Sequence, residues 1–266
     1  MTALPTSSSG VAPLAVRLAT LIDRESKTRF AGGSLGFLWA YITPITWVAF
    51  VVFIIRITGR TPPLAAEPEI FVATGILPYI VFRQSLNSMI RGAIFNRQML
   101  VIRGVSLGDL LLATALLEFA NMIVMMIVIF GAISIMFGIA PPSDPFKVAM
   151  AMSGAWFLAT GFGRLASLLG LMSDVIARLI PILLRPTFWL AGIFYTATEL
   201  SGALRDLLWW SPLLHVTEII REGYFLGYHS PISSPWVILV AGLVPYVASF
   251  FLEGMVLRKG ASKLRL

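Results

Sequence analysis

The clearest sign of how this chain folds lies at residues 29–44, which read RFAGGSLGFLWAYITP. A charged segment ends there, and small residues lead directly into an apolar run that continues to residue 57. A membrane-spanning helix needs about 20 consecutive, mostly apolar residues. We therefore expect the chain to leave the membrane surface at this point and to enter the bilayer as a helix over residues 35–57.

The preceding segment, residues 11–30, has the pattern of an amphipathic helix that lies on a membrane. Its apolar residues recur every three or four positions, and basic residues occupy much of the rest. The apolar set is Val11, Leu14, Leu18 and Leu21, and the basic set is Arg17, Arg24, Lys27 and Arg29. We expect an interface helix over these residues.

The composition indicates an all-α polytopic membrane protein. Of the 266 residues, 58% are hydrophobic and 12% are charged, and the mean hydropathy is +0.87. Soluble domains carry about twice that charged fraction. The length accommodates about six spanning helices, so we expect one transmembrane domain over residues 1–266 and no sizeable soluble catalytic domain. The expected spans are residues 35–57, 69–89, 107–137, 146–172, 179–195 and 235–257.

The basic residues indicate the orientation of these spans. The formal net charge is +7, but Lys and Arg are spread among the loops, so no nucleic-acid partner is expected. Cytoplasmic loops of membrane proteins are enriched in Lys and Arg, and six spans with both termini cytoplasmic place most basic residues on that side. The chain has no cysteine, which excludes disulfides and thiolate chemistry. Residues 1–10 lack the pattern of a cleaved signal peptide.

Residues 196–234 are too charged for a span and too apolar for a solvated loop. We expect two short helices that dip into the outer leaflet and return, with a turn at Ser211-Pro212. Trp209 and Trp210 precede this turn, and tryptophan is enriched at the depth of the lipid headgroups. The segment is therefore predicted to form an external re-entrant region before the last span.

Three residues of this region, His215, Glu218 and Glu222, admit two interpretations. A His-x-x-Glu pair places both side chains on one helical face, as in carboxylate metal sites, but no second such pair exists. The same side chains can pair with Arg221 or Arg205. We expect a structural polar network with no catalytic or metal site, and a membrane-embedded glycan or lipid transferase is the alternative. The predicted network is Trp209, Trp210, His215, Glu218, Arg221 and Glu222.

Three groups of residues follow one another along the chain. The first is Leu35-Gly36, Leu38-Trp39 and Pro44; the second is Gly59-Arg60, Phe71, Gly75 and Pro78-Tyr79-Ile80-Val81-Phe82; the third is Trp210-Ser211-Pro212, His215, Glu218, Arg221 and Gly223-Tyr224. With these groups in this order, the chain resembles type-2 ABC exporter permeases, and within them the subgroup that exports capsular polysaccharides.

The resemblance implies a homodimer of permeases that works with two cytoplasmic ABC ATPase subunits in the bacterial inner membrane. ATP and Mg would bind to those partners and no cofactor to this chain, whose sequence contains no G-x-x-x-x-G-K-[ST] loop. The implied substrate is a lipid-linked capsular polysaccharide, which periplasmic and outer-membrane export proteins would receive. The alternatives are O-antigen or teichoic acid as substrate, and a secondary transporter with Glu118 as its midplane carboxylate.

The cytoplasmic stretch 91–108 is the candidate region for coupling to the ATPase. Polar and basic side chains surround four apolar residues there, as in a short amphipathic helix that inserts its apolar side into a groove of a partner. The alternative is a solvated loop whose arginines only set the topology. The predicted coupling residues are Arg91, Asn96, Arg97, Gln98, Met99, Leu100, Val101 and Ile102.

Aromatic residues on the first and fifth expected spans are candidates for the translocation channel, because sugar rings present apolar C–H faces. Tyr41 and Tyr195 are the preferred pair, since each adds a hydroxyl group. Arginines at both mouths would guide an acidic glycan or a lipid phosphate. The alternative is that these side chains pack in the core, face lipid or extend to the headgroups. The predicted channel residues are Trp39, Tyr41, Phe188, Phe194, Tyr195, Arg56, Arg60, Arg83 and Arg185.

Overall fold

The computed structural model describes residues 13–29, 34–97 and 106–263, which form helices and connecting loops with no β-strand among them. The expected all-α class is confirmed for these residues. The elements are α1 (Leu14–Arg29), α2 (Ser34–Thr58), η1 (Pro63–Ala65), α3 (Pro68–Phe95), α4 (Leu107–Phe137), α5 (Pro145–Met172), α6 (Asp174–Leu183), α7 (Thr187–Leu190), α8 (Gly202–Leu208), α9 (Pro212–Tyr224) and α10 (Pro235–Lys263).

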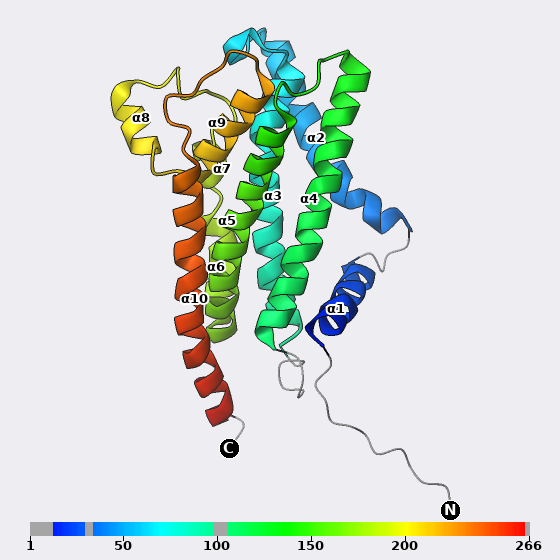
Figure 1. Cartoon of the computed structure of the whole chain (residues 1–266), viewed down its shortest axis with the longest axis vertical. Helices are drawn as coiled ribbons and strands as arrows, with labels where there is room; N and C mark the ends of the chain where they lie inside the picture. Colours follow the sequence, from blue (N-terminus) through cyan, green and yellow to red (C-terminus); the bar gives the residue numbers. More distant parts are fainter. Residues whose placement is uncertain (1–12, 30–33, 98–105, 264–266) are drawn as a thin grey trace, which may run out of the picture.

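The long helices form a bundle with α3 and α5 inside it (Figure 1). α2 and α4 pack against α3, and α10 packs along α5. From α2 to α5, consecutive helices run in opposite directions, as short connections require. Figure 1 also shows α1 at the same end of the bundle as the last turns of α10. α7, α8 and α9 lie toward the opposite end.

Within the described residues, four helices are long and apolar enough to cross a membrane, and they coincide with the first, third, fourth and sixth expected spans. Their apolar segments are Tyr41–Thr58, Leu107–Phe137, Pro145–Met172 and Pro235–Gly254. The second expected span forms α3, which has 28 residues and is less apolar than these four. Because neighbouring helices bury most of α3, buried positions such as Thr74, Ser85 and Ser88 are polar.

The fifth expected span, residues 179–195, is not one continuous helix. The structure divides it between α6 and the four-residue α7, with turns between Leu184 and Pro186. Proline has no backbone N–H to donate and its ring clashes with the preceding turn, so Pro186 interrupts the helix. Neither α6, with 10 residues, nor α7, with 4 residues, can cross a bilayer alone.

α5 and α10 approach each other closely because two glycines face each other. A Cβ atom at Gly161 would overlap the carbonyl oxygen of Gly242 and would lie 3.2 Å from its Cα atom. A Cβ atom at Gly242 would in turn lie 2.6 Å from the ring of Phe157. Small residues allow this kind of close helix packing in membrane proteins.

The predicted interface helix begins at Leu14 and packs against the first turns of α4. Leu18, Leu21 and Ile22 contact Leu110 and Ala113 there. The expected membrane face is therefore divided: part of the apolar stripe of α1 is buried in the protein, while Leu14 and Val16 remain exposed. The placement of α1 on a membrane stays a prediction.

Two polar contacts fix α1 to the bundle. Arg17 Nη1 lies 3.0 Å from Asp109 Oδ2, and Arg24 Nη2 donates a hydrogen bond to Asn96 Oδ1. Asp109 also closes a capping box with Ser106 at the N-terminus of α4. α1 is thus held by the end of α3 and by the beginning of α4.

Candidate functional site

The region 196–234, which is predicted to be external, contains α8 and α9 with the turn at Ser211, and it lies at the end of the bundle opposite α1 (Figure 1). The residues of α9 from Leu213 to Arg221 are all buried. Pro212 occupies the first turn of α9, where its missing N–H costs no helical hydrogen bond. The packing of α9 against α3, α5 and α10 therefore holds the polar side chains of this region inside the protein.

Arg221 is the centre of the predicted network. Its side chain is fully buried. Nη1 donates to the carbonyl oxygen of Tyr195 at 2.6 Å and to Glu218 Oε1 at 3.3 Å, and Nη2 donates to the carbonyl oxygen of Ile193 at 3.3 Å. The guanidinium carbon lies 4.2 Å from the ring centre of Phe71. One charged side chain therefore joins α9, α3 and the segment that follows α7.

Glu218, the counter-charge of Arg221, is also fully buried. Its Oε2 atom accepts a hydrogen bond of 2.5 Å from the hydroxyl group of Tyr228. The backbone near Ile193 reaches this pair because residue 75 of α3 is glycine: a Cβ atom there would lie 2.8 Å from the Cα of Ile193. Sequence analysis anticipated the pair of Glu218 with Arg221, but it gave no indication of Tyr228.

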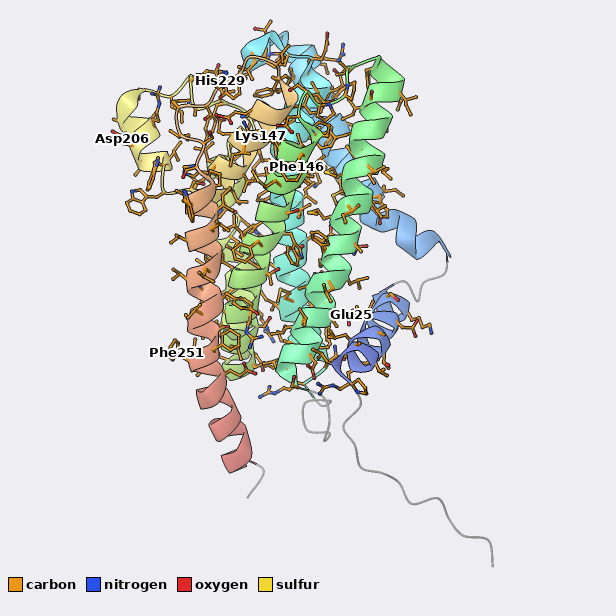
Figure 2. The ribbon with its side chains drawn as sticks, viewed as in Figure 1. Glu25, Phe146, Lys147, Asp206, His229 and Phe251 are labelled. Carbon is orange, nitrogen blue, oxygen red and sulfur yellow. The ribbon has the colours of Figure 1, made fainter. Side chains whose placement is uncertain are left out.

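Glu222 belongs to a second polar group. Its Oε2 atom lies 2.9 Å from Lys147 Nζ, and its Oε1 atom accepts hydrogen bonds from Ser233 Oγ at 2.6 Å and from the backbone N–H of Ser230 at 2.8 Å. Burial alone would raise the pKa of the Glu222 carboxyl, but the hydrogen bonds from Ser233, Lys147 and Ser230 outweigh it and lower that pKa. Figure 2 shows Lys147 at the N-terminal end of α5, on the same end of the molecule as His229.

His215 takes no part in either carboxylate group. Its Nε2 atom lies 2.7 Å from the carbonyl oxygen of Trp209. Arg205, the alternative partner for the carboxylates, instead donates to the carbonyl oxygen of Leu200 at 3.1 Å. Trp209 and Trp210 are exposed and meet edge to face, with ring centres 5.3 Å apart. Over the part of the chain that the structure describes, no three His, Asp or Glu side chains gather as metal ligands would.

An aromatic cluster forms around Phe188 where α7 meets α2 and α3. Its ring centre lies 5.1 Å from that of Tyr79, 6.1 Å from Trp47, 5.4 Å from Trp189 and 5.7 Å from Phe194. Trp47 and Trp189 leave much of their surface exposed. Phe188 and Phe194, two of the predicted channel residues, thus lie together, and Tyr79 joins them from α3.

The preferred tyrosine pair is not brought together. Arg56 lies about 22 Å along α2 from Tyr41, at 1.5 Å per residue. Arg56 pairs with Glu69 near Phe71, and Phe71 in turn contacts the Arg221 group that includes Tyr195. Tyr41 and Tyr195 therefore lie at different depths. The Tyr195 hydroxyl donates to the carbonyl oxygen of Trp189 at 3.1 Å, and the side chain of Trp39 lies outside the described residues.

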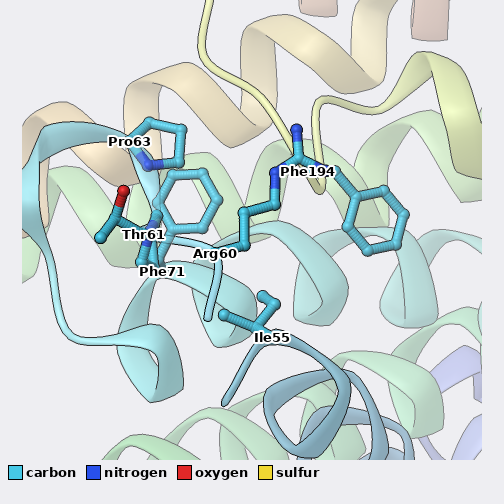
Figure 3. Close-up of a pocket in the computed structure, with 7 residues that line it drawn as sticks. Ile55, Arg60, Thr61, Pro63, Phe71 and Phe194 are labelled. Carbon is cyan, nitrogen blue, oxygen red and sulfur yellow. The ribbon is translucent and has the colours of Figure 1, made fainter. Parts of the chain in front are cut away.

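The four predicted channel arginines have different surroundings. Arg56 Nη2 lies 2.5 Å from Glu69 Oε1, so its charge is paired. Arg83 and Arg185 are exposed. Arg60 extends between the rings of Phe71 and Phe194 (Figure 3). It lines a cavity of about 30 Å³ together with Ile55, Thr61, Pro62, Pro63, Phe71 and Phe194.

The coupling region begins where α3 ends. Arg91 and Arg97 are exposed, but Asn96 is buried: its Nδ2 donates to the carbonyl oxygen of Gly92 at 2.8 Å and closes the helix end. Phe95, which sequence analysis did not single out, has 79% of its surface exposed between these arginines. The remaining predicted coupling residues, Gln98, Met99, Leu100, Val101 and Ile102, lie outside the described residues.

Known proteins of similar sequence export polysaccharides. The capsule polysaccharide export inner-membrane protein CtrC of Neisseria meningitidis serogroup A is 26% identical over 85% of this chain and 86% of its own length. The polysialic acid transport protein KpsM of Escherichia coli is 26% identical over 84% of this chain and 86% of its own length. The capsule polysaccharide export inner-membrane protein BexB of Haemophilus influenzae is 26% identical over 91% of this chain and 90% of its own length.

A family model covers the same part of the chain as the helices and the polar groups described above. Residues 16–225 match the model of the ABC-2 type transporter family. This match spans α1 to α9, and with them the predicted coupling region, the aromatic cluster and the Arg221 network. The expected family is confirmed: the chain belongs to the ABC-2 type transporter membrane family.

Proposed function

We propose that this chain is the membrane-spanning subunit of an ATP-driven ABC exporter that moves lipid-linked capsular polysaccharide across the bacterial inner membrane. The observation that carries the proposal is the similarity, over 84–91% of the chain, to proteins described as capsule polysaccharide export or polysialic acid transport proteins. The similarity extends through both the helices and the region before the last span, so it concerns the whole permease and not one motif.

The proposed topology has six passages through the membrane, with both termini in the cytoplasm. Five of these passages are the helices α2, α3, α4, α5 and α10. The remaining passage comes between α5 and α10 in the sequence; it is broken and consists of α6 and α7. Broken helices at membrane depth are tolerated where protein or a water-filled cavity surrounds them. α1 lies at the same end of the bundle as the last turns of α10, which supports an even number of passages. α8 and α9 would form the re-entrant pair at the outer surface.

A homodimer is proposed to enclose the polysaccharide path. The face of α2 that carries Ile45, Phe53 and Ile57 is exposed, as are Leu179 and Leu183 of α6. A second copy would cover part of this apolar surface. The cluster around Phe188 lies between these helices, and its exposed Trp47 and Trp189 would offer ring faces to sugars. Periplasmic and outer-membrane export proteins would receive the polymer.

Energy is proposed to come from two ABC ATPase subunits, which would bind ATP and Mg and would contact residues 91–108. Phe95 is the anchor that the structure offers, because a large exposed aromatic side chain flanked by Arg91 and Arg97 has the character of a binding hot spot. α3 and α4, which flank this region, would transmit the movement into the bundle.

The double substitution Phe95→Ser and Arg97→Glu is expected to lower the amount of ATPase that copurifies with the permease by about tenfold or more, as loss of a hot spot does. The permease is purified from native membranes, its partners are identified by mass spectrometry, and ATP hydrolysis is measured. The matched control is Phe146→Ser at the opposite end of the bundle, where Phe146 is 77% exposed against 79% for Phe95.

The control should retain the ATPase at the level of the unchanged chain. If the well-folded permease never copurifies with an ABC ATPase, the exporter proposal is wrong. If the double variant and the Phe146→Ser control retain the ATPase equally, the coupling role of this end is wrong while the exporter proposal stands.

The substrate is tested in strains that lack their own export permease. Expression of this chain together with its ATPase is expected to restore surface capsule, measured as extracted polymer, in a capsule-deficient strain. Restoration of O-antigen or teichoic acid in the corresponding strains, with no effect on capsule, would assign one of the alternative substrates. Cells that express a variant lacking residues 97–102 provide the negative control.

A further inference from the structure

A second cavity, of about 320 Å³, lies outside the proposed polysaccharide path. Residues of α3, α4, α5 and α10 line it, while the aromatic cluster involves α2, α3 and α7. One end of the cavity is polar, with Arg164 and Glu253. Phe250 lies beside Arg164, and the lining further along α4 is apolar, with Leu111, Leu112 and Ala115.

The polar end is built around Arg164, which is only 6% exposed. Its Nε donates to Ser249 Oγ at 2.8 Å, its Nη2 lies 2.5 Å from Glu253 Oε2, and its guanidinium carbon lies 4.3 Å from the ring centre of Phe250. The third nitrogen, Nη1, takes part in none of these hydrogen bonds. It points toward the first turn of α4, since a Cβ atom at Gly108 would lie 3.8 Å from it.

Two positive features therefore meet at this end of the cavity. Arg164 Nη1 is one, and the N-terminal end of α4 is the other. In this first turn Ser106 Oγ accepts from the backbone N–H of Asp109, and the Asp109 carboxylate is paired with Arg17. Helix N-termini of this kind bind phosphate groups. Glu253 supplies a negative charge beside them. Its Oε2 atom forms the ion pair with Arg164, in which its Oε1 atom takes no part.

The depth of the polar end matches that of lipid headgroups. Arg164 lies about 28 Å along α5 from Pro145, and Glu253 about 27 Å along α10 from Pro235, at 1.5 Å per residue. The hydrocarbon core of a bilayer is about 30 Å thick. The apolar lining residues Leu111, Leu112 and Ala115 follow Gly108 along α4 and therefore lie on the side of the membrane centre. The cavity is thus polar at headgroup level and apolar at acyl-chain level.

We infer that this cavity is a binding site for a membrane phospholipid with a primary-amine headgroup. The phosphate would contact Arg164 Nη1 and the first turn of α4, the ammonium group would donate to the free lone pairs of Glu253, and an acyl chain would cover Leu111 and Leu112. A headgroup that carries both charges complements the adjacent Arg164 and Glu253 better than a purely anionic one. The inference rests on the placement of the chain in the membrane, and it holds for any exported polymer.

The test is lipid binding to the purified full-length permease in detergent, measured by native mass spectrometry. Phosphatidylethanolamine, phosphatidylglycerol and phosphatidylcholine of equal chain length are added in turn. Phosphatidylethanolamine is expected to bind about tenfold more tightly than the other two, as a charged hydrogen bond provides. Equal retention of all three lipids would show only annular lipid and would overturn the inference.

Three variants locate the binding. Leu112→Trp fills the cavity and is expected to abolish the preference, while Leu116→Trp, one helical turn away and similarly exposed (39% against 42%), is expected to keep it. Glu253→Gln still accepts from Arg164 but lacks the charge, so its preference for phosphatidylethanolamine over phosphatidylglycerol is expected to fall to about twofold or less. A preference that survives Leu112→Trp, or that survives Glu253→Gln, would place the lipid elsewhere.

Discussion

Replacement of Arg221 by methionine is expected to lower the free energy of unfolding by about 3–5 kcal/mol, because it leaves a buried charge without its partner. Glu218 is fully buried and would keep only the hydroxyl of Tyr228. The carbonyl oxygens of Ile193 and Tyr195 would also lose their donor. A loss of this size is a large part of the stability of a typical domain. Thermal unfolding of the detergent-purified permease, followed by its tryptophan fluorescence, measures it.

The matched control is Arg205→Met in the same external region. Arg205 is half-buried and donates one hydrogen bond, to the carbonyl oxygen of Leu200, so the expected loss is about 1 kcal/mol. The double variant Arg221→Met with Glu218→Gln should recover part of the stability, because no uncompensated carboxylate remains. Arg221→Met and Arg205→Met variants that unfold at the same temperature would show that the buried pair does not organise this region.

The substitution Gly161→Ala is expected to separate α5 from α10 and to lower the stability of the permease by about 1–3 kcal/mol or more, as overpacking of a core does. The added methyl group would collide with the backbone carbonyl of Gly242. A flexible side chain could move aside, but the backbone of a 29-residue helix cannot yield locally. Thermal unfolding in detergent measures the effect.

Gly131→Ala is the matched control, since it makes the same chemical change inside α4. A Cβ atom there meets no heavy atom within 4 Å, and alanine is favoured over glycine in a helix interior by about 0.5–1 kcal/mol. The two variants are therefore expected to shift the unfolding temperature in opposite directions. A Gly161→Ala permease at least as stable as Gly131→Ala would mean that α5 and α10 do not pack as described.

The helices themselves could be predicted from the sequence because long apolar runs have few alternative structures. The expected third span coincides with α4, whose start is defined locally by the capping box of Ser106 and Asp109. The apolar residues of α3 likewise allowed this helix to be predicted, as the second span. The break between α6 and α7 follows from Pro186, which was not used to divide the expected span.

The polar contacts were predicted only where both partners lie within one helical turn. Glu218 and Arg221 are three residues apart, so their pairing could be anticipated. Lys147 and Glu222 lie in different helices, as do Arg164 and Glu253, and no local pattern indicates such pairs. The same reason explains why the sequence did not reveal the cavity beside Arg164, which four helices build together.

The two contacts of α1 with the bundle have a consequence for energy transfer in the proposed exporter. Arg24 binds Asn96 at the end of α3, and Arg17 binds Asp109 at the start of α4, so α1 bridges the two ends of the coupling region. A movement of either end must therefore change the contacts of α1. Coupling between two binding events is reciprocal, so in the proposed exporter a bilayer that altered the position of α1 would also alter the affinity for the ATPase. The composition of the membrane would then be an allosteric effector of the proposed pump.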